Sequence, residues 1–174
     1  SFEGGGAEKV FLTLANHISN YKQINSEIVL VKKKGVYLNE LSKKINILDL
    51  NSKRTLYCLI PLIKFMYKTD SDLIIGTQIH VNVMLIIAKF FVFNKISVIV
   101  RETSTPSELF DNILNNVFLK KIIFYLLSVF YKLNKFIICP SNGVAEDLIN
   151  NFRVNTKKIL IINNPIDFDK IDQK

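Results

Sequence analysis

Short apolar runs alternate with amphipathic segments along most of this chain. Apolar, β-branched runs closed by polar residues or Gly are typical of strands in a covered parallel sheet. Longer segments with apolar residues three and four positions apart are typical of helices packed on one side. The pattern predicts strands at residues 27–31, 45–50, 73–76, 96–100, 136–139 and 159–162. It predicts helices at residues 7–20, 52–68, 81–93, 107–133 and 142–152, with a helical turn at 41–44.

The alternation of strands and helices has the spacing of repeated βαβ units. Such units form a parallel sheet with helices on both faces, because consecutive parallel strands need a right-handed crossover. We therefore expect an α/β fold with a Rossmann-like parallel sheet. Pro61 should bend the helix expected at 52–68 or mark its true start.

Composition narrows the class of protein. The 174 residues are 49% hydrophobic and 22% charged, which argues against a disordered chain. The net charge of +8 comes almost entirely from Lys, and no aromatic and Arg motif for nucleic acid is visible, so we expect no nucleic-acid partner. Cys58 and Cys139 lie in apolar runs without metal-ligand or disulfide spacing, which predicts a reducing compartment and no metal site.

A glycine loop, Gly4 to Gly6, opens directly onto the first predicted helix. Gly lets the backbone turn sharply and lie close to a ligand, and the helix N-terminus presents free N–H groups and a positive dipole end. The natural ligand of such a loop is a phosphate, and the alternative is a flexible turn that only starts the helix. Glu8, in the first turn, is expected to stabilise the helix through the same dipole.

Polar residues follow the ends of the predicted strands, where ligands of a parallel α/β sheet bind. Besides the glycine loop, these residues are 77–80, 101–103, 141–142 and 163–164, and we expect them to form one rim. In this rim His80 either supports a helix start or binds a sugar hydroxyl or phosphate. Arg101 and Glu102 either pair with each other or bind an anion and a hydroxyl, respectively.

Five motifs, in this order, resemble the N-terminal domain of glycosyltransferase family 4 over essentially the whole chain. They are Gly4-Gly5-Gly6-Ala7-Glu8, the segment from Asp72 to Asn82, Val100-Arg101-Glu102, Pro140-Ser141-Asn142-Gly143 and Asn164-Pro165-Ile166-Asp167. Members have the GT-B architecture, two Rossmann-like domains facing across a cleft, and transfer a sugar from a nucleotide-sugar with retention of configuration. The resemblance implies an acceptor-side domain at 1–165 and the start of an interdomain linker at 166–174. It also implies a first strand that is mostly outside this chain and a C-terminal donor domain that is absent from it.

The resemblance also implies roles for individual residues. Gly5 and Gly6 would lie near the donor diphosphate, and His80 would be the catalytic residue near the reacting sugar. The acceptor side would be lined by Asn82, Arg101, Glu102 and Ser141. No metal and no cofactor besides the nucleotide-sugar are expected, because a helix N-terminus can stabilise the departing diphosphate. Many relatives carry another His at the position of Thr77, so that part of the site is expected to differ.

The expected protein is a fragment of a retaining glycosyltransferase that acts on a glycan or lipid-linked acceptor in cell-envelope polysaccharide synthesis. The fragment alone should be inactive, because a GT-B cleft needs its second domain to exclude water and hold the donor. Two alternatives stay open: a non-catalytic sugar- or membrane-binding module, and a nucleotide-sugar epimerase with the same architecture.

The apolar run at residues 122–131 lies between Lys120-Lys121 and Lys132. It is too short to span a bilayer, which needs about 20 apolar residues. The helix at 117–133 is therefore either buried in the core or interfacial, with its Lys residues at anionic headgroups and its aromatic residues at the acyl boundary. The interfacial alternative predicts a cytoplasmic protein attached peripherally to the inner face of the cell membrane.

Overall fold

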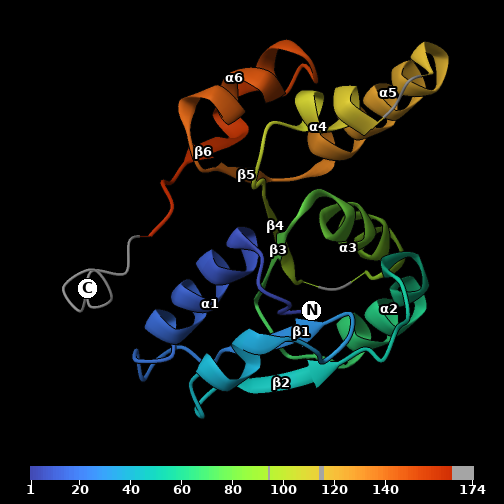
Figure 1. Ribbon diagram of the computed structural model, residues 1–174. Helices are drawn as coiled ribbons and strands as arrows, with labels where there is room; N and C mark the ends of the chain where they lie inside the picture. The colour runs from blue at the N-terminus through green and yellow to red at the C-terminus, as the bar shows by residue number, and fades with distance from the viewer. Residues whose placement is uncertain (94, 114–115, 166–174) are drawn as a thin grey trace. The chain divides into compact units, whose positions relative to one another are not determined.

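The computed structural model describes residues 1–93, 95–113 and 116–165. The chain divides into two compact units. Among the described residues, the first unit comprises residues 1–58 with Asn164 and Pro165, and the second comprises residues 59–163. Figure 1 shows the course of the chain through both units.

The first unit combines a helix with a two-stranded parallel sheet. Its elements are α1 (Gly6–Ile18), β1 (Glu27–Leu30), the 3₁₀ helix η1 (Val36–Glu40), β2 (Asn46–Asp49) and the 3₁₀ helix η2 (Thr55–Cys58). Strand β1 pairs with β2 in parallel, with Ile28 opposite Ile47. The core of this unit consists of the buried side chains of Phe2, Leu12, Ile28, Leu30, Leu41 and Ile45.

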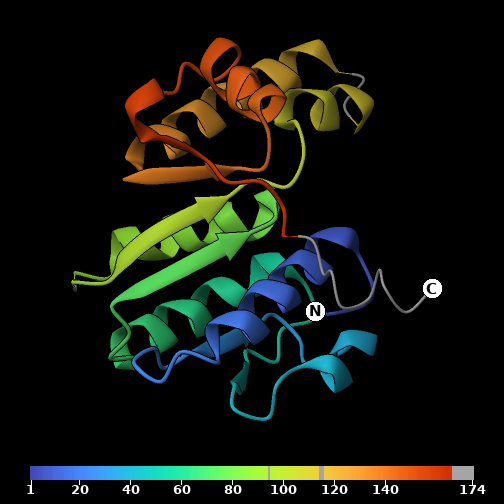
Figure 2. The ribbon, with the colours of Figure 1, turned by 90° about the vertical axis from the view of Figure 1, so that its left-hand side faces the viewer.

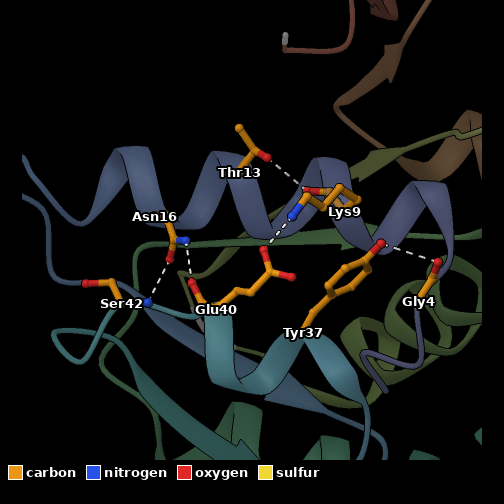
Figure 3. A network of polar contacts seen from close by, with 7 residues as sticks. All are labelled: Gly4, Lys9, Thr13, Asn16, Tyr37, Glu40 and Ser42. Carbon is orange, nitrogen blue, oxygen red and sulfur yellow. Dashed lines mark hydrogen bonds and ion pairs between the residues drawn. The ribbon is translucent and has the colours of Figure 1, made fainter. Parts of the chain in front are cut away.

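Polar contacts join α1 to η1 and to the residues that follow η1 (Figure 3). The Nζ atom of Lys9 lies 2.6 Å from Oε2 of Glu40. Asn16 makes two bonds: its Nδ2 donates to the carbonyl oxygen of Glu40 at 2.9 Å, and its Oδ1 accepts from the N–H of Ser42 at 2.8 Å. These contacts fix the position of α1 against the loop between β1 and β2.

The second unit is built on a parallel sheet with the strand order β3-β4-β5-β6. The strands are β3 (Leu73–Thr77), β4 (Ser97–Arg101), β5 (Phe136–Cys139) and β6 (Ile159–Ile161). The helices are α2 (Leu59–Lys68), α3 (Ile79–Phe91), α4 (Pro106–Ile113), α5 (Val117–Leu133), α6 (Asn142–Asn150) and the 3₁₀ helix η3 (Thr156–Lys158). Helix α3 packs on β3 and β4, as Figure 2 shows, and α6 packs on β5 and β6.

The register of this sheet places three strand ends at the same edge. Gly76 lies opposite Val100, which lies opposite Ile137, and these three residues are buried. One position further along the chain, Thr77 lies opposite Arg101, which lies opposite Ile138. The register therefore brings the polar residues that follow β3 and β4 close together.

The α/β class and all six predicted strands are confirmed, but the strands form two parallel sheets. Among the described residues, no pairing joins the sheet of β1 and β2 to the sheet of β3 to β6. Although the chain divides into two compact units, this division does not test the expected single domain at 1–165, which stays a prediction. The linker expected at 166–174 lies outside the described residues, as do Ile166 and Asp167 of the fifth motif.

The helical predictions differ from the structure in two details. The turn expected at 41–44 is present, with the N–H of Ile45 donating to the carbonyl oxygen of Ser42 at 3.1 Å, but the 3₁₀ helix η1 just before it was missed. Tyr37 and Leu38 of η1 pack against the core of the first unit. The region expected as one helix at 107–133 contains two helices, α4 and α5. The side chain of Asn116 caps α5 by accepting hydrogen bonds from the first helical N–H groups, at 3.0 and 3.1 Å. Pro61 lies in the first turn of α2 and marks its start, as predicted.

Candidate active site

Three of the polar residues expected at the rim meet where β3 and β4 end. Nη1 of Arg101 donates to Oγ1 of Thr77 at 3.4 Å. The backbone N–H of Glu102 donates to the carbonyl oxygen of Ile138 in β5 at 2.9 Å. Arg101 is 4% exposed and Glu102 is 1% exposed. The strand ends therefore bring these residues close together, but the side chains of Arg101 and Glu102 are buried and that of Thr77 is half-buried.

Asn82, in the first turn of α3, completes this buried cluster. Its Nδ2 donates to the carbonyl oxygen of Arg101 at 3.0 Å and to Oε1 of Glu102 at 2.9 Å. Its Oδ1 accepts no hydrogen bond from any residue that the structure describes. This oxygen lies against Gly76 of β3, where an added Cβ would be only 2.6 Å away. The lack of a side chain at position 76 therefore makes room for the amide of Asn82.

Burial determines the charge of Glu102. Burial raises the pKa of its carboxyl group to about 7, although the hydrogen bond from Asn82 and the positive charge of Arg101 oppose the shift. Burial lowers the pKa of the Arg101 guanidinium, and the nearby carboxyl of Glu102 opposes that change. Glu102 is therefore a buried carboxyl group that titrates near neutral pH.

Tyr131 of α5 was not expected in this cluster. Its ring is 2% exposed and packs edge-on against Phe152, with centroids 5.5 Å apart. Its hydroxyl lies near Glu102, and burial followed by the charge of that carboxyl raises its pKa. The hydroxyl has no hydrogen-bond partner of good geometry in the described part of the chain. The sequence offered no signal for this residue, because Tyr131 lies in an apolar helix far from the polar strand ends.

His80 lies two residues before Asn82 but is exposed, whereas Asn82 is buried. Partial burial of the imidazole ring lowers its pKa, which favours the neutral form at pH 7. Gln78, immediately before α3, has φ 73°, a left-handed conformation that is uncommon for residues other than Gly. The start of α3 therefore presents a neutral His next to a strained turn.

Ser141 lies at the carboxyl end of β5, as predicted, and its side chain caps α6. Its Oγ accepts a hydrogen bond from the N–H of Val144 at 3.4 Å. The side chain is exposed, so its expected contact with an acceptor stays a prediction.

Asp147 of α6 is a second buried carboxylate that sequence analysis missed. It accepts a hydrogen bond from the N–H of Ser107 at 3.1 Å, a closer one from the hydroxyl of Ser107, and one from Nδ2 of Asn151 at 2.5 Å. It thereby caps the N-terminus of α4 from another helix. No sequence signal pointed to this contact, because the two partners are 40 residues apart.

The glycine loop belongs to the first unit, where Glu8 occupies two of its amides (Figure 3 shows the loop at Gly4). The N–H groups of Gly4 and Gly5 donate to Oε2 of Glu8 at 2.9 and 3.1 Å. A first-turn carboxylate that accepts hydrogen bonds from the N–H groups just before the helix forms half of a capping box. This contact agrees with the structural role expected for Glu8. A Cβ on Gly6 would meet nothing within 4 Å, so the first turn of α1 is open there. The expected grouping of Gly5 and Gly6 with His80 stays a prediction.

The described residues contain no group of three His, Cys, Asp or Glu side chains that could hold a metal ion. Of the predicted site residues, His80 and Ser141 are exposed in the second unit, and Gly6 lies at an open turn in the first unit. Asn82, whose side chain is hydrogen-bonded to the buried Glu102, follows His80 by two residues.

The sequence matches the family model described as Glycosyltransferase Family 4 over residues 4–170. It is also 29% identical, over 184 aligned residues, to the N-acetylgalactosamine-N,N'-diacetylbacillosaminyl-diphospho-undecaprenol 4-alpha-N-acetylgalactosaminyltransferase of Campylobacter jejuni. That match covers 100% of this chain and 48% of the relative, so the chain spans about half the length of that protein. The chain belongs to glycosyltransferase family 4.

Proposed function

We propose that this chain is the acceptor-side half of a retaining glycosyltransferase that transfers a sugar from a nucleotide-sugar to a lipid-linked glycan during cell-envelope polysaccharide synthesis. The observation that carries the proposal is the match of the whole chain to a relative named for an acceptor linked to diphospho-undecaprenol. The membership of this chain in glycosyltransferase family 4 supports glycosyl transfer as the reaction class.

The described residues have the properties that this reaction needs. Negative charge develops on the diphosphate as the sugar leaves, and the first turn of α1, which is open at Gly6, would stabilise it through the positive end of the helix dipole. Gly5, whose N–H already donates to Glu8, would lie beside the diphosphate. His80 is exposed, and its lowered pKa favours a neutral imidazole that can bind a sugar hydroxyl. Ser141 and the end of β4 would contact the acceptor. In this proposal the nucleotide-sugar is the only small molecule required besides the acceptor.

The test is a transfer assay on the whole protein. UDP- and GDP-linked hexoses and N-acetylhexosamines, each radiolabelled, would be incubated with a synthetic sugar linked to a short-chain polyprenyl diphosphate. Transfer from one donor into the lipid-extractable product, with the anomeric configuration of the donor retained by NMR, is expected. His80→Ala should lower kcat by about a hundredfold, the loss expected when a contact that holds the reacting sugar in place is removed. His17→Ala, on the exposed side of α1, is the matched control and should leave kcat unchanged.

Other outcomes would overturn the proposal. Interconversion of nucleotide-sugars without transfer would identify an epimerase, and sugar binding without turnover would identify a non-catalytic module. Transfer by residues 1–174 alone would contradict the expected need for a second domain.

Helix α5 supports a position at a membrane surface. Its outer side carries apolar residues three and four positions apart that are 38–74% exposed, namely Phe118, Ile122, Tyr125, Leu126, Val129 and Leu133. We call this set the α5 surface. The opposite side of the helix is packed, with Leu127 and Tyr131 buried. The helix is thus partly core and partly exposed apolar surface.

The charge of α5 favours an anionic partner. The helix contains three Lys and no Asp or Glu. Lys120 forms an ion pair with Asp111 of α4, whereas Lys121 and Lys132 are exposed. We propose that the α5 surface enters the acyl boundary of the cytoplasmic leaflet while these two Lys residues contact anionic headgroups. Within the described ranges, no helix combines the length and the apolar character needed to cross a bilayer.

Co-sedimentation with vesicles tests this position. The whole protein should bind phosphatidylglycerol vesicles more tightly than phosphatidylcholine vesicles, and added salt should weaken the binding. The double variant Phe118→Ser with Tyr125→Ser should lose most of the binding. Tyr57→Ser removes an aromatic residue of similar exposure (67%) outside α5 and is the control. Equal binding to neutral and anionic vesicles, or no loss in the double variant, would contradict the proposal.

A further inference from the structure

The bridge between Asn82 and Glu102 joins the two segments that carry His80 and Arg101. Asn82 lies in the first turn of α3, two residues after His80, and its N–H donates to the carbonyl oxygen of Gln78 at 2.9 Å. Its side chain donates to the carbonyl oxygen of Arg101 and to the carboxyl of Glu102, at the end of β4. One amide group therefore ties the start of α3 to the end of the neighbouring strand.

The surroundings leave this amide little freedom. Gly76 lies against its Oδ1, at a distance that would not accommodate a Cβ. Glu102 is in turn tied to β5 through its own backbone N–H. Gln78 keeps a left-handed backbone conformation that costs roughly 1–3 kcal/mol and persists only where neighbouring contacts hold it. The turn that ends at Asn82 is thus held in one strained conformation by buried contacts.

We infer that Asn82 and Glu102 are positioning residues that hold the imidazole of His80 and the end of β4 in the geometry for transfer, and do not contact the acceptor. Both side chains are 1% exposed and bonded to each other, which leaves neither amide nor carboxyl at a surface. This inference replaces the acceptor-binding role expected from the resemblance, and its catalytic consequence rests on the proposed function.

Steady-state kinetics on the whole protein separate positioning from binding. The probes are the nucleotide-sugar and the polyprenyl-diphosphate acceptor that the assay above identifies. Asn82→Ala should lower kcat by about tenfold to a hundredfold, the loss typical of small misplacements of a reacting group. Both KM values should change less than threefold. Asn150→Ala, at an exposed Asn in α6, should leave kcat and KM unchanged.

A second comparison uses the carboxyl partner. Glu102→Gln keeps an oxygen that accepts from Asn82, so kcat should stay within a few-fold of the wild type. Glu102→Ala removes that oxygen and should resemble Asn82→Ala. Glu146→Gln on the exposed side of α6 is the matched control for removing a charge.

The isosteric variant Asn82→Asp adds a test by pH. Its new carboxyl group faces Glu102, with Arg101, Tyr131 and Cys139 as the other ionisable groups around that residue. Two adjacent carboxyl groups share a proton at lower pH, and the shared proton restores one hydrogen bond. The kcat of Asn82→Asp, relative to wild type, should therefore rise as pH falls, whereas that of Asn82→Ala should not.

NMR titration of His80 provides a measurement that does not depend on turnover. In Asn82→Ala the turn loosens, the imidazole becomes more exposed and its pKa should rise towards the ordinary value. Asn150→Ala should leave the titration unchanged.

A raised acceptor KM with unchanged kcat would overturn the inference in favour of direct acceptor contact. If Asn82→Ala only lowers the melting temperature, with kcat and the His80 titration unchanged, the bridge supports the fold and does not position His80. If no donor is transferred the proposed function fails, and the titration of His80 alone decides the positioning role.

Discussion

The Oδ1 atom of Asn82 lies beside Gly76, 2.6 Å from where a Cβ on that residue would be. Two hydrogen bonds from Nδ2 hold the amide in this place, so it cannot move away without losing contacts to Arg101 and Glu102. Gly76 does not need a left-handed backbone conformation. The requirement for Gly at this position therefore comes from packing against a side chain on another element.

Gly76→Ala should destabilise the protein by about 1–3 kcal/mol, the usual cost of overpacking a closed site. The cost should be smaller when Asn82→Ala is also present, because that change removes the nearest atom that the new Cβ meets and leaves Cδ2 of Leu85 at 3.0 Å. Gly143→Ala in α6 is the control, since a Cβ there meets only Oγ of Ser141 at 4.0 Å. Urea unfolding of the four variants measures the coupling between positions 76 and 82, and equal costs in both backgrounds would contradict the geometry.

Gly35→Ala should be more harmful than Gly4→Ala, although both residues have positive φ, of 128° and 121°. A Cβ on Gly35 would lie 1.9 Å from the carbonyl oxygen of Phe2, whereas on Gly4 it meets only Val36 at 3.7 Å. Gly4→Ala should cost about 1–2 kcal/mol for the backbone conformation alone. Gly35→Ala adds the clash and should cost at least about 2 kcal/mol more, as forced backbone shifts do. Thermal melting of the two variants checks the order, and similar losses would show that the chain at Phe2 moves aside freely.

Glu102→Gln should remove part of the pH dependence of folding. Burial raises the pKa of Glu102 from 4.5 to about 7, so the folded protein holds this proton more tightly than the unfolded chain. The contribution of Glu102 to the free energy of unfolding is fully present below about pH 4.5 and is lost as pH rises through about 7. The free energy of unfolding of the wild type should fall by roughly 3 kcal/mol across that range because of this group. Urea unfolding at several pH values should show a shallower loss for Glu102→Gln, and Glu146→Gln should keep the wild-type slope.

Asp147→Ala should destabilise the second unit strongly. The change leaves the N–H and hydroxyl of Ser107 and the amide of Asn151 without their acceptor. Ser107 is half-buried and loses the contacts that cap α4, whereas Asn151 is exposed and can bond to water, so a loss of about 1–3 kcal/mol is expected. Glu146→Ala, at the exposed neighbouring position, should change stability by less than about 0.5 kcal/mol. Urea unfolding midpoints measure both, and a loss below 1 kcal/mol for Asp147→Ala would mean that water replaces the carboxylate.

The elements of this fold could be read from the sequence because each depends mainly on residues close together in the chain. The apolar run at 136–139 became β5 with the predicted bounds, and α6 begins at Asn142, where a helix start was predicted. The prediction of one helix at 107–133 missed the start of a second helix, α5. The sequence did hold a signal for this start, because Asn116 is a residue type that favours helix starts and lies within an otherwise apolar pattern.

The sequence by itself determined the α/β class, the order of strands and helices and the membership of glycosyltransferase family 4. Local periodicity shows which residues share a face, and five short motifs keep their order at strand ends. Tertiary structure alone decided which faces are covered and which groups are paired. His80 and Asn82 are two residues apart and both polar, yet one is exposed and the other lies inside with Glu102, 20 residues further along. The reason is physical: strand register and helix packing bring distant side chains together, and hydrogen bonds between them depend on those distances rather than on neighbours in the chain.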